Sequence, residues 1–277
     1  MIRTERIPAR NPLAISVAGQ GPLVVLVHGM GGDRTTWHAQ IEALRERYTA
    51  ASVDLRGYGD SADPSEPLDF KRDFTADLLA VMDHFGAQRA HLVGLSMGGR
   101  VVRSACLREP ARVASLTLAN TSPGFDAMDA AEMDRFIAER SQRVSASALP
   151  ADFGIAQVHQ MMAPGTDPDV MQTAAQAMQR LRPAQYLQVL AASTRQDWGD
   201  RLEDIACPTL VITSDQDRVY PAPIAEQMLA RLPRARHVRI PNAGHLSNLE
   251  QPQAFNQALR AFLDELPPEA AARRTAT

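Results

Sequence analysis

Short runs of apolar residues alternate along the chain with stretches in which apolar residues recur every three or four positions. Residues 23–27 form an unbroken apolar run, which is typical of a strand covered on both faces of a parallel sheet. Further strands are predicted at residues 50–54, 90–93, 113–119, 209–213 and 237–240. Helices are predicted at residues 36–47, 70–85, 96–107 and 251–265. This alternation predicts an α/β fold with a doubly wound, mostly parallel sheet.

The alternation stops between residues 122 and 202, where no run has the pattern of a strand. Helical spacing persists in that segment, and prolines divide it into short pieces. Because a structureless loop of about eighty residues is implausible in a compact domain, we expect a helical cap. The predicted organisation is an α/β core made of residues 1–121 and 203–277, with residues 122–202 inserted as the cap.

The composition of the chain argues against several classes of partner and of mechanism, so they are not expected. The 277 residues carry a formal net charge of -3, which favours neither nucleic acid nor an anionic membrane as a partner. Lys71 is the only lysine and no glycine loop precedes it, so Schiff-base, pyridoxal and P-loop mechanisms are not expected. Cys106 and Cys207 are too few for a disulfide scaffold or a four-ligand zinc site. With neither a secretory signal nor an apolar stretch near the ~20 residues of a membrane helix, we expect a cytoplasmic protein.

A serine stands at one junction between a predicted strand and the helix after it. Residues 94–98 read Gly-Leu-Ser-Met-Gly, which matches G-x-S-x-G in the strand–turn–helix context that supports this motif. Gly94 and Gly98 lack the Cβ atoms that would clash across so tight a turn. The turn would present Ser96 at the carboxyl edge of the sheet, where open α/β folds bind their ligands. Ser96 is therefore the candidate nucleophile.

A glycine-rich loop follows the strand at residues 23–27, with the sequence His28-Gly29-Met30-Gly31-Gly32. Loops of this type offer a backbone N–H to a developing oxyanion, and glycines let the backbone approach the substrate closely. Met30 is the expected donor, together with Met97 directly after the nucleophile. His28 itself is expected to be structural.

The general base must come within about 3 Å of the serine oxygen. Only His245 follows the last predicted strand by a short loop, at the same sheet edge as Ser96. The other histidines fall in predicted helices, at strand starts, at a strand end or in the insert: His28, His38, His84, His91, His159 and His237.

An acid that orients this base should follow another strand at that edge. Both Asp215 and Asp217 follow the strand at residues 209–213. We favour Asp217, because Asp215 is closer to the strand and better placed to bond turn amides. Asn120, after the preceding strand, carries no negative charge to hold an imidazolium.

These motifs together resemble the α/β-hydrolase superfamily over nearly the whole chain. The matching segments are residues 28–32, 54–61, 94–99, 215–217 and 244–245. A serine nucleophile separates the chain from relatives with aspartate there, and residues 244–252 with 94–99 are similar to the 3-oxoadipate enol-lactonase and carboxylesterase branch. The resemblance implies a serine hydrolase with the triad Ser96, Asp217 and His245 and no metal or organic cofactor. In the segment at 54–61, Asp54 and Arg56 are expected to pin loops near the site.

The expected reaction is hydrolysis of a small-molecule ester or lactone through an acyl-enzyme. Two alternatives remain open: a carbon–carbon hydrolase of ring-fission products, and a receptor of this fold with slow turnover. Candidate substrate-binding residues are Gly29, Trp37, Phe125, Met161 and Trp198, although apolar residues at such spacing are more often core. Insert arginines such as Arg135, Arg143 and Arg195 could bind an acidic substrate, but surface exposure is the simpler expectation.

Overall fold

The structure is a computed structural model. It describes residues 1–8, 11–64, 67–125, 128–142, 144–145, 148–196, 199, 201–232 and 234–267. These residues contain one eight-stranded sheet with the strand order β1-β2-β4-β3-β5-β6-β7-β8. Its strands are β1 (Arg3–Ile7), β2 (Leu13–Ala18), β3 (Leu23–Val27), β4 (Thr49–Val53), β5 (Ala90–Leu95), β6 (Val113–Ala119), β7 (Thr209–Ser214) and β8 (Ala235–Ile240). Strands β4, β3, β5, β6, β7 and β8 are parallel, whereas β2 runs antiparallel to both of its neighbours. The predicted fold class is confirmed.

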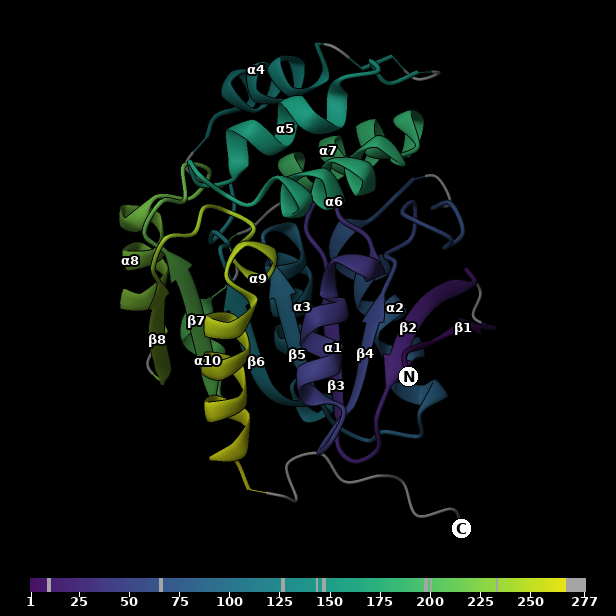
Figure 1. The fold of residues 1–277 in the computed structure, drawn as a ribbon, viewed down its shortest axis with the longest axis vertical. Helices are drawn as coiled ribbons and strands as arrows, with labels where there is room; N and C mark the ends of the chain where they lie inside the picture. Colours follow the sequence, from purple (N-terminus) through teal and green to yellow (C-terminus); the bar gives the residue numbers. More distant parts are fainter. Residues whose placement is uncertain are drawn as a thin grey trace.

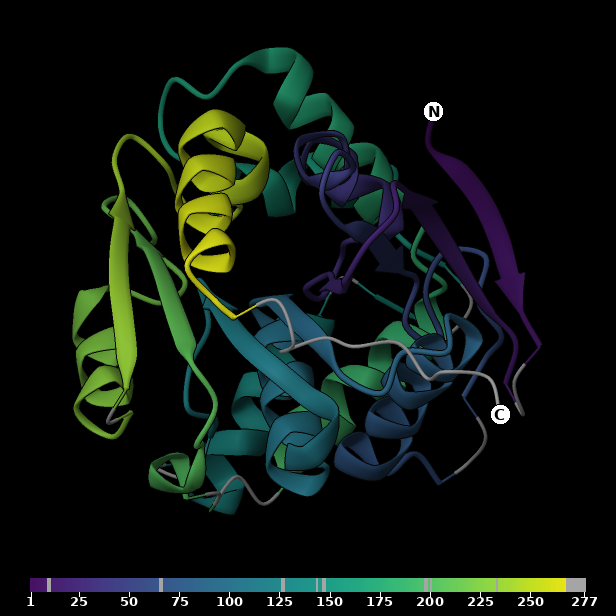
Figure 2. The ribbon, with the colours of Figure 1, turned by 90° about the horizontal axis from the view of Figure 1, so that it is seen from below.

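Helices cover both faces of the sheet (Figures 1 and 2). The helices that pack on it are α1 (His38–Leu44), α2 (Phe70–His84), α3 (Met97–Arg108), α8 (Ala222–Ala230) and α10 (Pro252–Asp264). In β3, Val25 belongs to the apolar core shared with α2 and α3, whereas Leu26 belongs to the core shared with α1 and α10. Successive residues of a strand point to opposite faces, so the unbroken apolar run of β3 serves two cores at once.

The first two strands are absent from the sequence-based prediction, which begins the sheet at β3. In β1 four of the five residues are exposed or half-exposed, and they include Arg3, Glu5 and Arg6. β2 is buried throughout, but it combines Ser16 with alanines and so lacks the strong apolar run that marks β3. The predicted helix at residues 36–47 is in fact a 3-10 turn, Arg34–Trp37, followed by α1.

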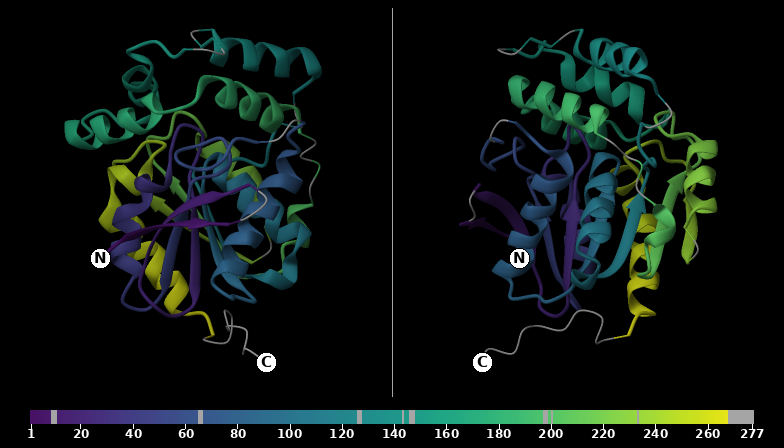
Figure 3. Two further views of the ribbon diagram at one scale, coloured as in Figure 1. Left: turned by 90° about the vertical axis from the view of Figure 1, so that its right-hand side faces the viewer. Right: turned by 180° about the vertical axis from the view of Figure 1, so that it is seen from behind.

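Among the described residues between β6 and β7 there are four α-helices: α4 (Ala130–Ser141), α5 (Phe153–Met161), α6 (Pro168–Gln179) and α7 (Pro183–Arg195). They form a layer across one end of the sheet, which we call the cap helices (Figures 1 and 3). This is the end at which the parallel strands finish, because the loops after β3, β5, β7 and β8 share one pocket with residues of these helices. None of the helices in the described parts of the chain combines the length and apolarity that crossing a membrane requires.

Candidate active site

Ser96 occupies a strained turn between β5 and α3. Its backbone has φ 55° and ψ -120°, a conformation that side-chain-bearing residues rarely adopt and that costs on the order of 1–3 kcal/mol. A Cβ on Gly94 would lie 2.2 Å from the Gly98 carbonyl oxygen, and one on Gly98 would lie 2.2 Å from that of Val27. Gly94 is therefore required for the turn itself, and Gly98 for the close packing of the turn against β3. The Ser96 N–H donates to the Ala119 carbonyl at 2.9 Å, which helps to hold the strained residue.

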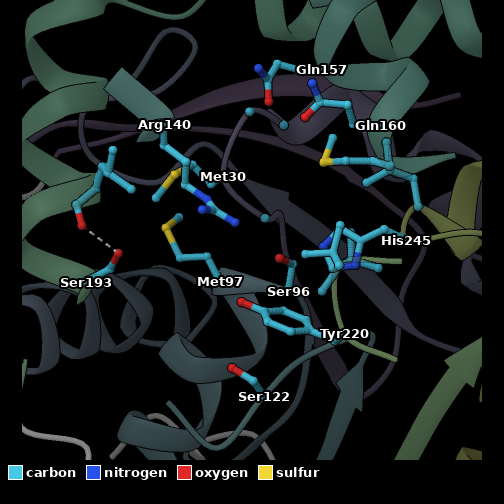
Figure 4. Close-up of a pocket in the computed structure, with 18 of the residues that line it drawn as sticks. Met30, Ser96, Met97, Ser122, Arg140, Gln157, Gln160, Ser193, Tyr220 and His245 are labelled. Atoms are coloured by element: carbon cyan, nitrogen blue, oxygen red, sulfur yellow. Dashed lines mark hydrogen bonds between the residues drawn. The ribbon is translucent and has the colours of Figure 1, made fainter. Parts of the chain in front are cut away.

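The loop after β3 is fixed by His28 (Figure 4 shows the pocket beside it). The Leu55 backbone N–H donates to His28 Nε2 at 3.1 Å, so the opposite ring nitrogen, Nδ1, carries the proton and donates to the Gly29 carbonyl at 2.8 Å. Burial lowers the pKa of His28 despite that hydrogen bond, which favours the neutral ring. His28 is thus a structural residue that holds the backbone of the loop.

Gly29 faces Ser96. A Cβ at this position would come within 2.9 Å of Ser96 Cβ and 3.5 Å of Ser96 Oγ, so glycine keeps the space beside the hydroxyl open. Gly29, Met30, Ser96 and Met97 line the same pocket. As the first residue of α3, Met97 has a backbone N–H without a partner inside the helix.

Asp217 contacts His245, which lines the pocket. His245 Nδ1 lies 3.0 Å and 3.2 Å from the two carboxylate oxygens of Asp217. Burial opposes ionisation of Asp217, but the charge of His245 and hydrogen bonds from His245, Tyr220 and Asn120 outweigh it and hold the pKa of Asp217 below its usual value. Because an ionised carboxylate only accepts, His245 Nδ1 donates to it, and in the neutral form of the ring the other nitrogen, Nε2, is the acceptor.

Of the seven histidines, all within the described residues, only His245 lines the pocket that contains Ser96. Figure 4 shows Ser96 with Met97 on one side and His245 on the other. Asp215 is directed elsewhere, because one of its oxygens accepts a hydrogen bond from the Ala243 backbone at 3.3 Å. The structure therefore places Ser96 and His245 in one pocket, and it places Asp217, the second of the two candidate aspartates, against His245.

The pocket has a volume of about 980 Å³ and lies between the sheet edge and the cap helices. Phe125 and Met161 line it, as proposed from the sequence. Trp37 does not: it is fully buried beneath the loop, with its ring 5.9 Å from that of Phe255 in an edge contact. The assignment of Trp37 to substrate binding is therefore wrong, since its bulk is used to join α1 and α10. Trp198 lies outside the described residues.

Asp54 and Arg56 make the loop contacts that their motif implies. Asp54 accepts from the backbone amides of Arg34 at 2.6 Å and Asp60 at 2.9 Å. Arg56 is buried and donates twice to the Asp77 carboxylate on α2, at 2.8 and 2.6 Å. Neither side chain lines the pocket.

Two side chains that sequence reasoning overlooked tie the cap to the loops of the site. Glu250, in α9 (Ser247–Glu250), accepts from the backbone amides of Gly244 at 2.9 Å and Leu246 at 3.0 Å, on either side of His245. The same carboxylate accepts from the Ala163 amide at 2.7 Å and the Thr166 hydroxyl at 3.0 Å, both after α5.

The second overlooked side chain is Arg218, next to Asp217. It donates to the carbonyl oxygens of His159 at 3.0 Å and Met162 at 2.8 Å, at the end of α5. A cation suits the negative end of a helix. The sequence signal for either residue is only a charge close to a candidate site residue: Arg218 is next to Asp217, and Glu250 is five residues after His245.

Comparison with known proteins places the chain in a family. The sequence family described as alpha/beta hydrolase fold matches residues 22–252. The chain therefore belongs to the α/β-hydrolase fold family. It is 28% identical over 260 residues to 3-oxoadipate enol-lactonase 1 of Acinetobacter baylyi, covering 92% of this chain and 94% of that one.

Solved structures give the same result. A thermophilic esterase from Thermogutta terrifontis, with malate bound, is 31% identical with a TM-score of 0.82, and the match covers 95% of this chain and 98% of that one. A hydrolase from Pseudomonas aeruginosa PA01 is 30% identical with a TM-score of 0.82, over 94% and 98% of the two chains. These comparisons confirm the resemblance inferred from the motifs: the chain belongs to the α/β-hydrolase fold family, and an enol-lactonase and an esterase are among the proteins similar to it.

Proposed function

We propose that the protein is a serine hydrolase that cleaves a carboxylic ester or lactone of a small molecule through an acyl-enzyme. Ser96 is the nucleophile, His245 the general base and acid, and Asp217 the group that orients the histidine. The backbone N–H groups of Met30 and Met97 form the oxyanion hole. The observation that carries the proposal is the Asp217–His245 hydrogen bond in the pocket that also contains the strained Ser96.

The first half of the reaction forms the acyl-enzyme. Ser96 Oγ attacks the acyl carbon while His245 Nε2 takes its proton, and the electron pair of the carbonyl moves to the oxygen held by the two N–H groups. When that pair returns, the bond to the alkoxide breaks and His245 delivers the proton to it. A lactone follows the same path, except that the alcohol stays attached to the acyl group.

The second half uses water in place of the serine hydroxyl. His245 removes a proton from the water, hydroxide adds to the acyl carbon, and Ser96 leaves with the proton returned from His245. Asp217 stays ionised throughout and stabilises the imidazolium, which agrees with the low pKa that its hydrogen bonds give it.

A substrate panel tests this proposal. We expect wild-type protein to hydrolyse 4-nitrophenyl esters or enol-lactones, and Ser96→Ala to reduce kcat on the same compound by at least ~10³-fold with the fold retained by circular dichroism. Equal rates for wild type and Ser96→Ala would refute the assignment of the nucleophile. Turnover of coloured ring-fission dienoates, but not of esters or lactones, would favour the carbon–carbon hydrolase. Acylation without release would favour the receptor.

A further inference from the structure

The lining of the pocket has a charge opposite to that of the whole chain. Among the described residues that line it there are four arginines and one carboxylate: Arg100, Arg140, Arg218, Arg231 and Glu139. The chain as a whole carries -3. A concave wall with an excess of one charge concentrates ligands of the opposite charge, so the pocket favours anions.

Two of these arginines are already engaged in holding the protein together. Arg218 donates to two carbonyl oxygens at the end of α5. Arg231 donates to the Glu203 carboxylate at 2.8 Å. They add to the positive field, but their hydrogen-bonding groups have protein partners.

Arg140, at the last turn of α4, differs from them. Its guanidinium stacks on the ring of Phe136 at 3.5 Å from the ring centre, and it forms no ion pair with a carboxylate of the described residues. Three other arginines of the cap helices and the loops between them pair with carboxylates: Arg180 with Asp33, Arg182 with Asp63 at 2.8 Å, and Arg195 with Asp134 at 2.7 Å.

Figure 4 shows the Arg140 side chain descending from the cap into the pocket, with its nitrogen atoms towards Met97 and Ser96. The Arg140 side chain is exposed to water in the large pocket, but the surrounding protein excludes part of the water that would otherwise hydrate its guanidinium. This desolvation lowers the pKa of Arg140, and the charge of Arg100 acts in the same direction, whereas Tyr220, Tyr186 and Glu139 act against it. An anion placed there would offset the lost hydration by forming an ion pair.

We propose that Arg140 is a substrate-binding residue that pairs with a carboxylate of the substrate, so that the preferred esters or lactones carry a free carboxylate beyond the scissile bond. The inference rests on the proposed hydrolase function and adds the class of substrate. A planar guanidinium stacked on an aromatic ring presents its edge to a carboxylate in the two-point geometry that this pair prefers. Arg100, which is buried with its guanidinium 4.6 Å from the centre of the Phe125 ring, adds positive potential behind that position.

The test uses two substrates that differ in one charge: mono-4-nitrophenyl glutarate and its methyl ester. Wild type is expected to have the higher kcat/KM on the anion. In Arg140→Gln, the ratio of kcat/KM for the anion to that for the methyl ester is expected to fall by about 10- to 100-fold, the range for losing a charged hydrogen-bond partner. Arg140→Lys should retain part of the preference, since it keeps the charge but not the fork.

Arg135→Gln is the matched control, because Arg135 is an exposed arginine of the same helix that does not line the pocket. Its substitution should leave the ratio unchanged. A second measurement avoids turnover: monomethyl glutarate should raise the melting temperature of Ser96→Ala, and adding Arg140→Gln should abolish the shift.

The outcomes separate the two proposals. If wild type hydrolyses both esters and Arg140→Gln leaves the ratio at its wild-type value, the carboxylate site is refuted while the hydrolase function stands. If wild type hydrolyses the methyl ester faster than the anion, the substrate class is wrong. If it hydrolyses neither ester and monomethyl glutarate gives no shift, both proposals fail together.

Discussion

The carboxylate of Glu250 connects the cap to the loop that carries His245, and replacing it tests whether that connection positions the base. Its oxygen Oε2 accepts from Ala163 at 2.7 Å, Gly244 at 2.9 Å and Thr166 at 3.0 Å, while Oε1 accepts from Leu246 at 3.0 Å. Glu250→Gln keeps one acceptor oxygen but turns an amide group towards a backbone N–H. Glu250→Ala removes the acceptor for all four donors.

The magnitudes follow from these contacts. In Glu250→Gln, the amide oxygen can replace Oε2 and leave one donor, the Leu246 N–H, unsatisfied, at a cost of about 1–3 kcal/mol. Glu250→Ala leaves four donors to find water at a half-buried site, so we expect a loss of roughly 3–5 kcal/mol. For a chain of this size each kcal/mol lowers the melting temperature by roughly 2–4 °C.

Activity supplies the second readout, since a merely structural residue would change stability alone. Gly244 and Leu246 flank His245, so release of both amides in Glu250→Ala should displace the imidazole from Ser96 and reduce kcat by about 10- to 100-fold with little effect on KM. Glu42→Gln is the control, because Glu42 forms only an exposed pair with Arg45 at 3.0 Å, which is worth less than ~1 kcal/mol. Wild-type kcat in a Glu250→Ala protein that is destabilised by the expected amount would refute the positioning role and leave only a structural one.

Three further predictions follow from single buried positions. Trp37→Ala should destabilise the protein by about 3–5 kcal/mol through the cavity left beside Phe255, with KM unchanged; a raised KM at wild-type stability would restore Trp37 to the pocket. Gly29→Ala should lower kcat by ~10²-fold or more, because the new Cβ would lie 2.9 Å from Ser96 Cβ and crowd the space beside its hydroxyl; stopped-flow assay of ester cleavage measures kcat, and an unchanged kcat would contradict this prediction. Burial lowers the pKa of His91 to about 4. Between pH ~6.5 and that lowered pKa, His91 is therefore protonated in the unfolded chain but neutral in the folded chain. The free energy of unfolding should therefore fall as the pH falls through this range. Urea unfolding at a series of pH values should show a weaker pH dependence of this free energy in His91→Gln than in wild type. An unchanged pH dependence would exclude His91 as its source.

The core strands and the site motifs could be predicted because each depends on residues close in sequence. The apolar run of β3 alone predicts that both faces of the strand are buried, with no knowledge of the neighbouring strands. Likewise, Gly94 and Gly98 lie on either side of Ser96 within one turn. His245 and Asp217 follow from their place after the last two strands, since parallel strands bring their carboxyl ends to one edge.

What the sequence could not give depends on contacts between distant segments. β2 is recognisable only through its pairing with β4, because its small and polar residues carry no strong apolar signal. Trp37 follows a loop of the site in sequence, yet its ring turns away from the pocket to pack on Phe255. The roles of Glu250 and Arg140 could also be inferred only from the structure. In the sequence nothing distinguishes them from the other charged residues, because their roles depend on where the cap helices lie over the sheet.

The central claim is that Ser96 becomes acylated with His245 as its base, and labelling with a fluorophosphonate tests it most directly. Intact-mass spectrometry should show one adduct per chain on wild type, and peptide mapping should place it on Ser96. Ser96→Ala should remain unlabelled, and His245→Ala should label far more slowly because the serine then keeps its proton. An adduct on another residue, or equal labelling of wild type and Ser96→Ala, would contradict the account.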